Sequence, residues 1–152
     1  MVRIKLTKNK YALIDNEDFD LVSQCSWHCT KTGYAQSNKK HWKVLMHRLI
    51  LGFPKHNIDH KNGNGLDNRR ENLRLCNQSQ NTANSGIRKT NKSGYKGVTC
   101  ENRNPNMKWV ANLTKNYKHI YIGAFRTKES AARAYNQRAL KEFGEFANLN
   151  IL

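Results

Sequence analysis

Residues 84–93 interrupt the chain with a stretch that lacks hydrophobic periodicity. They read Asn-Ser-Gly-Ile-Arg-Lys-Thr-Asn-Lys-Ser, a composition typical of flexible linkers. A chain of 152 residues divided at this point has room for two small domains. We therefore expect one domain at 1–84 and another at 94–152, with a linker at 85–93.

The first 46 residues contain short runs of aromatic and β-branched residues separated by turn sequences. Six strands are expected, at 3–6, 11–14, 19–22, 27–30, 34–37 and 43–46. They predict a small antiparallel sheet. Residues 46–51 predict a short helix that ends at Gly52, with Pro54 just beyond. After Asn57 the chain becomes polar and rich in Asn, and Asn77 with Gln80 predicts a capping box at the start of another short helix.

The second half has its own pattern. Three strand-like runs follow the linker, at 97–100, 108–114 and 119–125. Thr127 is expected to cap a helix that Gly144 ends. Its apolar residues recur at helical spacing at Ala132, Tyr135, Ala139 and Phe143. The expected fold class is α+β, with a small antiparallel β region in the first half and a three-stranded antiparallel sheet packed on one helix in the second.

The charge predicts a polyanionic partner. The chain carries 27 Lys and Arg against 11 Asp and Glu, a formal net charge of +16. Residues 1–85 hold 14 basic and 7 acidic residues, and residues 86–152 hold 13 and 4, so the excess covers both halves. Nucleic acid is the expected partner, because neutralising phosphates releases counterions. The sequence has no apolar run of membrane-spanning length and no secretory signal, which favours a cytoplasmic protein.

The four cysteines are Cys25, Cys29, Cys76 and Cys100. They include no C-x2-C pair, so the spacing favours neither a disulfide framework nor a structural zinc site. Four free thiols are the expected state.

One set of polar residues has the composition of a catalytic site. Asp59 and His60 are adjacent in a predicted strand, Asn72 follows in the polar region, and Asn81 lies in the short helix. Asp59 offers a hard oxygen to a divalent cation, while His60, on the opposite strand face, can transfer a proton. Asn81 can add a second oxygen ligand, and Asn72 can hold the intervening loop by hydrogen bonds.

The sequence around this set resembles the HNH homing endonucleases of the ββα-metal fold, in their phage and intron-borne subclass. The similarity covers the runs Met-His-Arg-Leu-Ile at 46–50, Ile-Asp-His-Lys-Asn-Gly-Asn at 58–64, Leu-Asp-Asn-Arg-Arg-Glu-Asn-Leu-Arg at 66–74 and Gln-Asn at 80–81. The resemblance implies a ββα-metal core at about 45–84. It implies metal ligation by Asp59 and Asn81, His60 as general base, and Asn72 as the residue that orients the catalytic loop.

The expected cofactor is Mg²⁺ or another divalent cation such as Mn²⁺. Arg69, Arg70 and Arg74 flank the set and are candidates for phosphate contacts; a solvated basic loop is the alternative interpretation. His47 also falls in the similar stretch, but a buried position beside the site is the preferred interpretation for it.

Residues 93–150 resemble the DNA-binding domain of the plant ethylene-response-factor (Apetala-two) family. The similarity includes Ser-Gly-Tyr-Lys-Gly-Val at 93–98, Ile-Tyr-Ile-Gly-Ala-Phe at 120–125 and Gly-Glu-Phe-Ala-Asn-Leu-Asn at 144–150. In that family the sheet enters the major groove. Candidate DNA contacts are Lys96, Arg103, Lys108, Trp109, Asn112, Thr114 and Tyr121. The plant domain has Arg at several of the corresponding strand positions, so its sequence preference is not transferred.

The sequence thus predicts a homing-type endonuclease that hydrolyses double-stranded DNA to 5′-phosphate and 3′-hydroxyl ends. No membrane and no obligate protein partner is expected. The resemblance suggests a phage or intron-associated gene, and hence the bacterial host cytoplasm. Two alternatives stay open: a DNA-binding regulator with an inactive nuclease half, and an RNA-binding or ribosome-associated basic protein.

Overall fold

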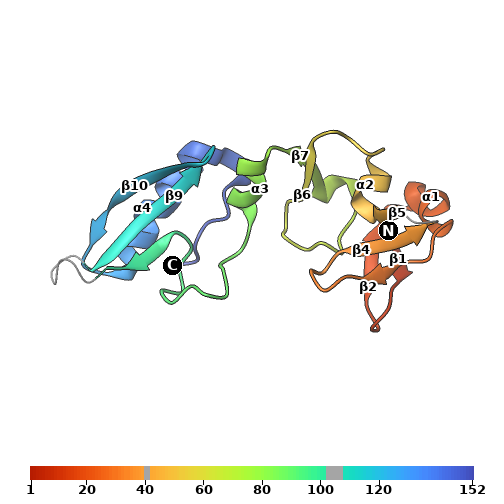
Figure 1. Ribbon diagram of the computed structural model, residues 1–152, viewed down its shortest axis with the longest axis horizontal. Coiled ribbons are helices and arrows are strands. Elements are labelled where there is room, and N and C mark those ends of the chain that lie inside the picture. Colours follow the sequence, from red (N-terminus) through yellow and green to blue (C-terminus); the bar gives the residue numbers. More distant parts are fainter. Residues whose placement is uncertain (40–41, 102–107) are drawn as a thin grey trace. The chain divides into compact units, whose positions relative to one another are not determined.

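The computed structural model describes residues 1–39, 42–101 and 108–152. The chain forms two compact units, Met1–Cys76 and Asn77–Leu152, each with its own hydrophobic core (Figure 1). The division falls before the helix that precedes the expected linker, because Ala83 of that helix is buried in the second core. Residues 85–93 likewise lie inside the second unit, where Ser93 is buried and donates a hydrogen bond to the Val98 carbonyl.

The first unit contains three small antiparallel sheets. Its strands are β1 (Val2–Lys5), β2 (Tyr11–Ile14), β3 (His28–Cys29), β4 (Ala35–Lys39), β5 (Trp42–Leu45), β6 (Asn57–His60) and β7 (Leu73–Cys76). Its helices are η1 (Asn16–Asp18), α1 (Phe19–Ser23), α2 (Met46–Ile50) and η2 (Arg70–Asn72). The strands pair as β1 with β2, as β3 with β4 and β5, and as β6 with β7.

The prediction of a strand at 19–22 is wrong, since these residues begin helix α1. Of the apolar side chains there, only Val22 is buried, whereas Phe19 and Leu21 are 43% and 39% exposed. One inward residue per turn suits a short helix better than a strand. Asp18, which precedes the helix, is buried because it pairs with Arg70 from far along the chain, a contact that local sequence does not reveal.

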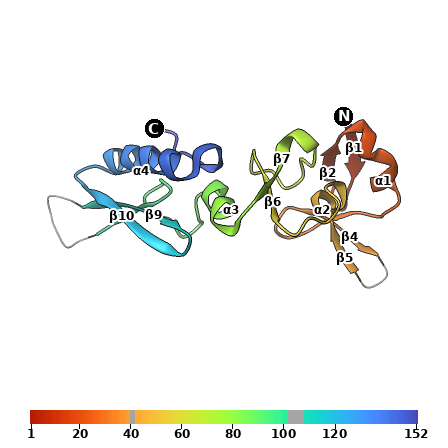
Figure 2. The same ribbon diagram turned by 90° about the horizontal axis from the view of Figure 1, so that it is seen from above.

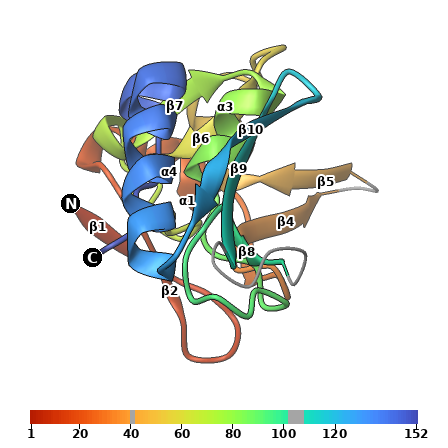
Figure 3. The same ribbon diagram turned by 90° about the vertical axis from the view of Figure 1, so that its left-hand side faces the viewer.

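The second unit places one long helix against a three-stranded sheet. Its elements are α3 (Gln78–Asn84), β8 (Val98–Cys100), β9 (Trp109–Lys115), β10 (Lys118–Phe125), α4 (Lys128–Phe143) and η3 (Gly144–Phe146). The strand order is β10-β9-β8, and α4 covers one face of the sheet (Figures 2 and 3). Ala131, Ala132 and Ala139 are buried at the helix–sheet contact, where small side chains allow close approach.

The caps expected from the sequence are confirmed. Thr127 accepts a hydrogen bond from the Ser130 amide at the start of α4, and Gly144 ends the helix with a φ of 54°. Asn77 and Gln80 form the complete capping box at the start of α3. In the part of the chain that the structure describes, no helix combines the length and hydrophobicity needed to span a membrane.

Candidate active site

Strands β6 and β7 bring the central residues of the site together. Their antiparallel register places Asp59 opposite Arg74, and His60 opposite Leu73. The Asp59 carboxylate accepts a hydrogen bond at Oδ2 from Arg74 Nε at 2.9 Å, and the same oxygen forms an ion pair with Arg74 Nη2 at 2.8 Å. Both side chains are almost fully buried, with 7% and 10% exposure. Arg74 therefore orients the carboxylate instead of standing free in solvent.

The His60 ring contacts the side-chain amide of Asn68, which is fully buried. Its Nε2 lies 3.2 Å from Oδ1 of Asn68. Burial lowers the pKa of His60, and this effect outweighs the hydrogen bond to Asn68 and the carboxylates of Asp59 and Asp67, which act in the opposite direction. The imidazole is therefore neutral near pH 7, the state in which it can accept a proton.

Two further rings pack around His60. The His47 ring lies edge-on at 5.0 Å between centroids, and the Tyr34 ring lies at 5.7 Å. Burial lowers the pKa of His47 to about 4, with smaller contributions from the nearby His60 and Arg48 charges. His47 is buried and its Nδ1 has no hydrogen-bond partner. Both imidazoles are thus uncharged at neutral pH, and His47 is a buried neighbour of His60.

Asn72 closes the connection between β6 and β7. Its Nδ2 donates to the Asp67 carbonyl at 2.7 Å, and its Oδ1 accepts from the Asn62 amide at 3.0 Å. The same connection is fastened to β2, because the Asn68 amide donates to the Leu13 carbonyl at 2.8 Å. Asn72 therefore makes the loop-holding hydrogen bonds expected of it, while its part in catalysis stays a prediction.

The arginines of this region are paired with carboxylates that the sequence reasoning missed. Arg69 binds both carboxylate oxygens of Asp67, and its hydrogen bonds lower the pKa of that carboxyl group. Arg70 binds both oxygens of the buried Asp18, which raises the pKa of the guanidinium. The Arg69–Asp67 pair lies within the connection between β6 and β7, and the Arg70–Asp18 pair ties that connection to η1. Phosphate contacts by the arginines stay a prediction. The sequence did not predict the pair of Asp18 and Arg70, because the two residues are 52 positions apart.

Asn81, the expected second metal ligand, lies on α3 and so belongs to the second unit. Within that unit it continues the helix begun by the capping box, its amide donating to the Asn77 carbonyl at 3.0 Å. Its role as a ligand stays a prediction.

The predicted DNA contacts of the second unit have varied environments. Lys108 and Thr114 are exposed, Tyr121 is 62% exposed, and Trp109 and Asn112 are half-buried. Arg103 lies outside the described residues.

The side chain of Lys96 makes hydrogen bonds within the protein that the sequence did not predict. Its ammonium group donates to the Ala83 carbonyl and, at 2.6 Å, to the Ser85 carbonyl, at the end of α3. Burial lowers the pKa of Lys96 to about 8. A basic side chain at a helix C-terminus satisfies carbonyls that have no partner within the helix. The ammonium group is therefore engaged inside the protein.

Comparison with known proteins assigns the chain to a family. Residues 44–83 match the family model described as HNH endonuclease, a span that includes β6, β7 and all but the last residue of α3. An uncharacterized HNH endonuclease of Acanthamoeba polyphaga mimivirus is 31% identical over 150 residues, covering 94% of this chain and 76% of the viral protein. The chain belongs to the HNH endonuclease family, whose members are DNA nucleases.

A second relative matches a shorter part of the chain. An AP2/ERF and B3 domain-containing protein of Oryza sativa subsp. japonica is 38% identical over 58 residues, which is 38% of this chain and 15% of the rice protein. No solved structure matches the chain.

HNH nucleases generally depend on a divalent cation, so the donor set can be tested for fit. Among residues 1–39, 42–101 and 108–152, no three His, Cys, Asp or Glu side chains converge on one point. A hard cation that keeps waters and takes phosphate oxygens needs only one or two carboxylates. Carboxylates that bind metal ions are commonly oriented by neighbouring hydrogen-bond donors. The buried Asp59 is oriented by Arg74 in this way and fits such a cation.

Proposed function

We propose that this protein is a homing-type endonuclease that hydrolyses one phosphodiester bond of double-stranded DNA with His60 as the general base. The observation that carries the proposal is the buried imidazole of His60, in contact with Asn68 at Nε2 and adjacent on β6 to the oriented carboxylate of Asp59. A base next to a cation ligand is the combination that phosphodiester hydrolysis requires.

In the proposed reaction, His60 accepts a proton from a water molecule whose oxygen attacks phosphorus. The bond from phosphorus to the 3′ oxygen breaks in line with the attack, and the leaving 3′ oxygen takes a proton from a second water molecule. The products are a 5′-phosphate and a 3′-hydroxyl end. Asp59 and Asn81 are the residues that would hold the cation, with Mg²⁺ the best match to oxygen donors and Mn²⁺ an alternative. The cation supplies stabilisation of the negative charge that grows in the transition state. Asn72 keeps the 61–72 connection, and with it His60, in place.

The second unit is proposed to hold the enzyme on DNA in the manner of an Apetala-two domain. Three features support this role: the 58-residue similarity to the rice protein, the sheet backed by one helix, and the 13 basic against 4 acidic residues at 86–152. A β-sheet edge or ribbon can enter the major groove. Exposed Lys108, Thr114 and Tyr121 are the proposed contacts with the best access.

A phage or intron-borne gene, acting in the cytoplasm of a bacterial host, is the proposed setting. The proposal for the setting rests on the sequence resemblance alone.

The test is cleavage of supercoiled plasmid and phage genomic DNA in Mg²⁺. His60→Ala should lower the rate of nicking by about 100-fold or more, because a general base contributes at least that factor. His56→Ala is the matched control: it removes an exposed imidazole from the same segment and should leave the rate unchanged. EDTA should abolish cutting by all three proteins.

Cutting that persists in EDTA, or that survives the loss of His60, would contradict the proposal. If all three proteins bind duplex DNA yet leave it intact in Mg²⁺, the regulator with an inactive nuclease half becomes the better interpretation.

A further inference from the structure

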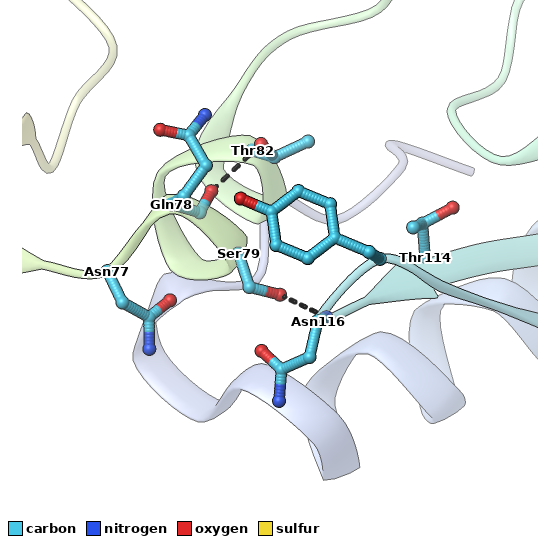
Figure 4. Close-up of a pocket in the computed structure, with 7 residues that line it drawn as sticks. Asn77, Gln78, Ser79, Thr82, Thr114 and Asn116 are labelled. Atoms are coloured by element: carbon cyan, nitrogen blue, oxygen red, sulfur yellow. Dashed lines mark hydrogen bonds between the residues drawn. The ribbon is translucent and has the colours of Figure 1, made fainter.

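The second unit contains a cavity of about 330 Å³ between α3 and the turn that joins β9 to β10 (Figure 4). Its lining residues are Asn77, Gln78, Ser79, Thr82, Thr114, Asn116 and Tyr117. One hydrogen bond joins the two walls, from the Asn116 amide to Ser79 Oγ at 3.1 Å. Neither the catalytic proposal nor the similarity to known proteins gives this cavity a role.

The chemistry of the lining selects among ligand classes. None of the seven lining residues carries a charged side chain, so the cavity has no counter-charge for a phosphate or a metal ion. Its carboxamides and hydroxyls offer donors and acceptors side by side. Such groups match the hydrogen-bonding edge of a nucleobase, which also presents donors and acceptors in one plane. The volume lies near the lower end of about 300–1,000 Å³ for small-molecule sites and suits one base.

Tyr117 adds an aromatic surface at the rim. Its side chain is 90% exposed, and its backbone has a φ of 64° next to Asn116 at 49°. Two residues with positive φ between paired strands form the hairpin turn that strongly prefers Gly at its second position. A bulky residue there is strained, and strain of this kind is retained mostly at functional sites. The turn therefore holds an exposed ring where Gly would be more stable.

We propose that the cavity takes a single unpaired nucleobase of bound DNA, stacked on the Tyr117 ring with its polar edge toward Gln78 and Asn116. This inference rests on the proposed function, in that the partner is DNA. The surrounding charge agrees with a nucleic acid, because residues 86–152 carry 13 basic residues against 4 acidic ones and Lys118 beside the turn is exposed. The neutral cavity would then take the base, while basic groups outside it contact the backbone.

The experiment compares three labelled duplexes in EDTA, by fluorescence anisotropy with the full chain. The first is fully paired, the second carries one unpaired adenine, and the third carries an abasic site at the same position. Wild type should bind the unpaired adenine at least about 5-fold more tightly than the abasic duplex, the smallest effect expected of base–aromatic stacking.

Tyr117→Gly is the test variant because it removes the ring and relieves the strained φ, so thermal stability should not fall. It should reduce the discrimination to less than about 2-fold, since stacking is lost. Phe53→Gly is the matched control: it removes another exposed ring, 53% exposed, at a φ of 55° in the first unit. This variant should keep the full discrimination.

The inference is overturned by equal affinity of wild type for the adenine and abasic duplexes, by unchanged discrimination in Tyr117→Gly, or by loss of discrimination in Phe53→Gly. Plasmid cleavage in Mg²⁺ separates the two proposals. If wild type cleaves plasmid but does not distinguish the adenine duplex from the abasic duplex, only the proposal of a base-binding cavity is wrong. If it distinguishes them but does not cleave plasmid, only the nuclease proposal is wrong.

Discussion

At the scale of single residues, the site is built from buried polar groups, and Asp59 and His60 each have a polar partner nearby. Asp59 and Arg74 form an ion pair with little solvent exposure, and such pairs hold geometry more than they add stability. His60 has the same kind of support from Asn68, which is fully buried. These neighbours determine which way the carboxylate and the imidazole point.

Asn68→Ala is expected to reduce kcat by about 10- to 100-fold with little change in KM, because the amide orients the imidazole and does not meet substrate. We expect Asn68 Oδ1 to accept a hydrogen bond from His60 Nε2–H, so that the wild-type imidazole carries its proton on Nε2. Nitrogen-15 spectra of labelled His60 should show this tautomer in wild type and a mixture in the variant. Asn68→Asp, which keeps an acceptor, should retain more of the tautomer. Identical spectra for wild type and Asn68→Ala would show that Asn68 has no orienting role.

His47 predicts how the stability of the first unit depends on pH. Its pKa falls from 6.5 in the unfolded chain to about 4 in the folded protein. Above pH 6.5 the free energy of unfolding therefore does not depend on the titration of His47. As the pH falls from 6.5 towards 4, the free energy of unfolding decreases by up to about 3 kcal/mol, because the unfolded chain binds the proton more tightly.

Urea unfolding measured between pH 7 and pH 4 tests this dependence against His47→Phe, which keeps an aromatic ring but cannot take up a proton. The variant should lose less stability on acidification. A curve parallel to that of wild type would mean that His47 does not couple to folding.

At the scale of elements, close packing in the second unit depends on Gly97, which has a φ of 72°. A Cβ atom there would lie 2.1 Å from the Tyr135 ring and 2.6 Å from the Asn112 carbonyl oxygen. Position 97, directly before β8, therefore has no room for a side chain against Tyr135 of α4 and Asn112 of β9.

Gly97→Ala is expected to destabilise the second unit by about 3 kcal/mol or more, because both overpacking and backbone strain oppose it. Gly94→Ala is the matched control: its φ is 80° but nothing lies within 4 Å, so only the conformational cost of about 1 kcal/mol applies. Thermal unfolding of the two variants should differ clearly. Equal melting temperatures would contradict the packing seen at Gly97.

At the scale of the whole molecule, the proposed cation ligands come from both units. Asp59 lies on β6 of the first unit, and Asn81 lies on α3 of the second.

Asn81→Ala should raise the Mg²⁺ concentration needed for half-maximal cleavage and lower the maximal rate, while DNA affinity in EDTA stays unchanged, because the ligand acts on the transition state. Asn81→Asp retains an oxygen ligand and should recover part of the rate. Titration of cleavage with Mg²⁺ is the measurement. A Mg²⁺ dependence identical to that of wild type would exclude Asn81 as a ligand.

Several local features of this protein are determined by short stretches of its sequence. The capping box of Asn77 and Gln80, the cap at Thr127 and the helix end at Gly144 were predictable because each depends on a few neighbouring residues. The adjacent Asp59 and His60 could be proposed as site residues for the same reason, because residue type and spacing along one strand suggest cation binding and proton transfer; their roles stay predictions.

Which charged and polar side chains pair with one another was decided by the tertiary structure alone. The pairs Asp18 with Arg70 and Asp59 with Arg74, and the ammonium of Lys96 on the carbonyls of α3, join residues distant in sequence. The same holds for the helix at Phe19–Ser23 and for the cavity beside Tyr117. Burial, desolvation and pairing are properties of the folded surroundings, because they depend on groups that only the completed fold brings within a few ångströms.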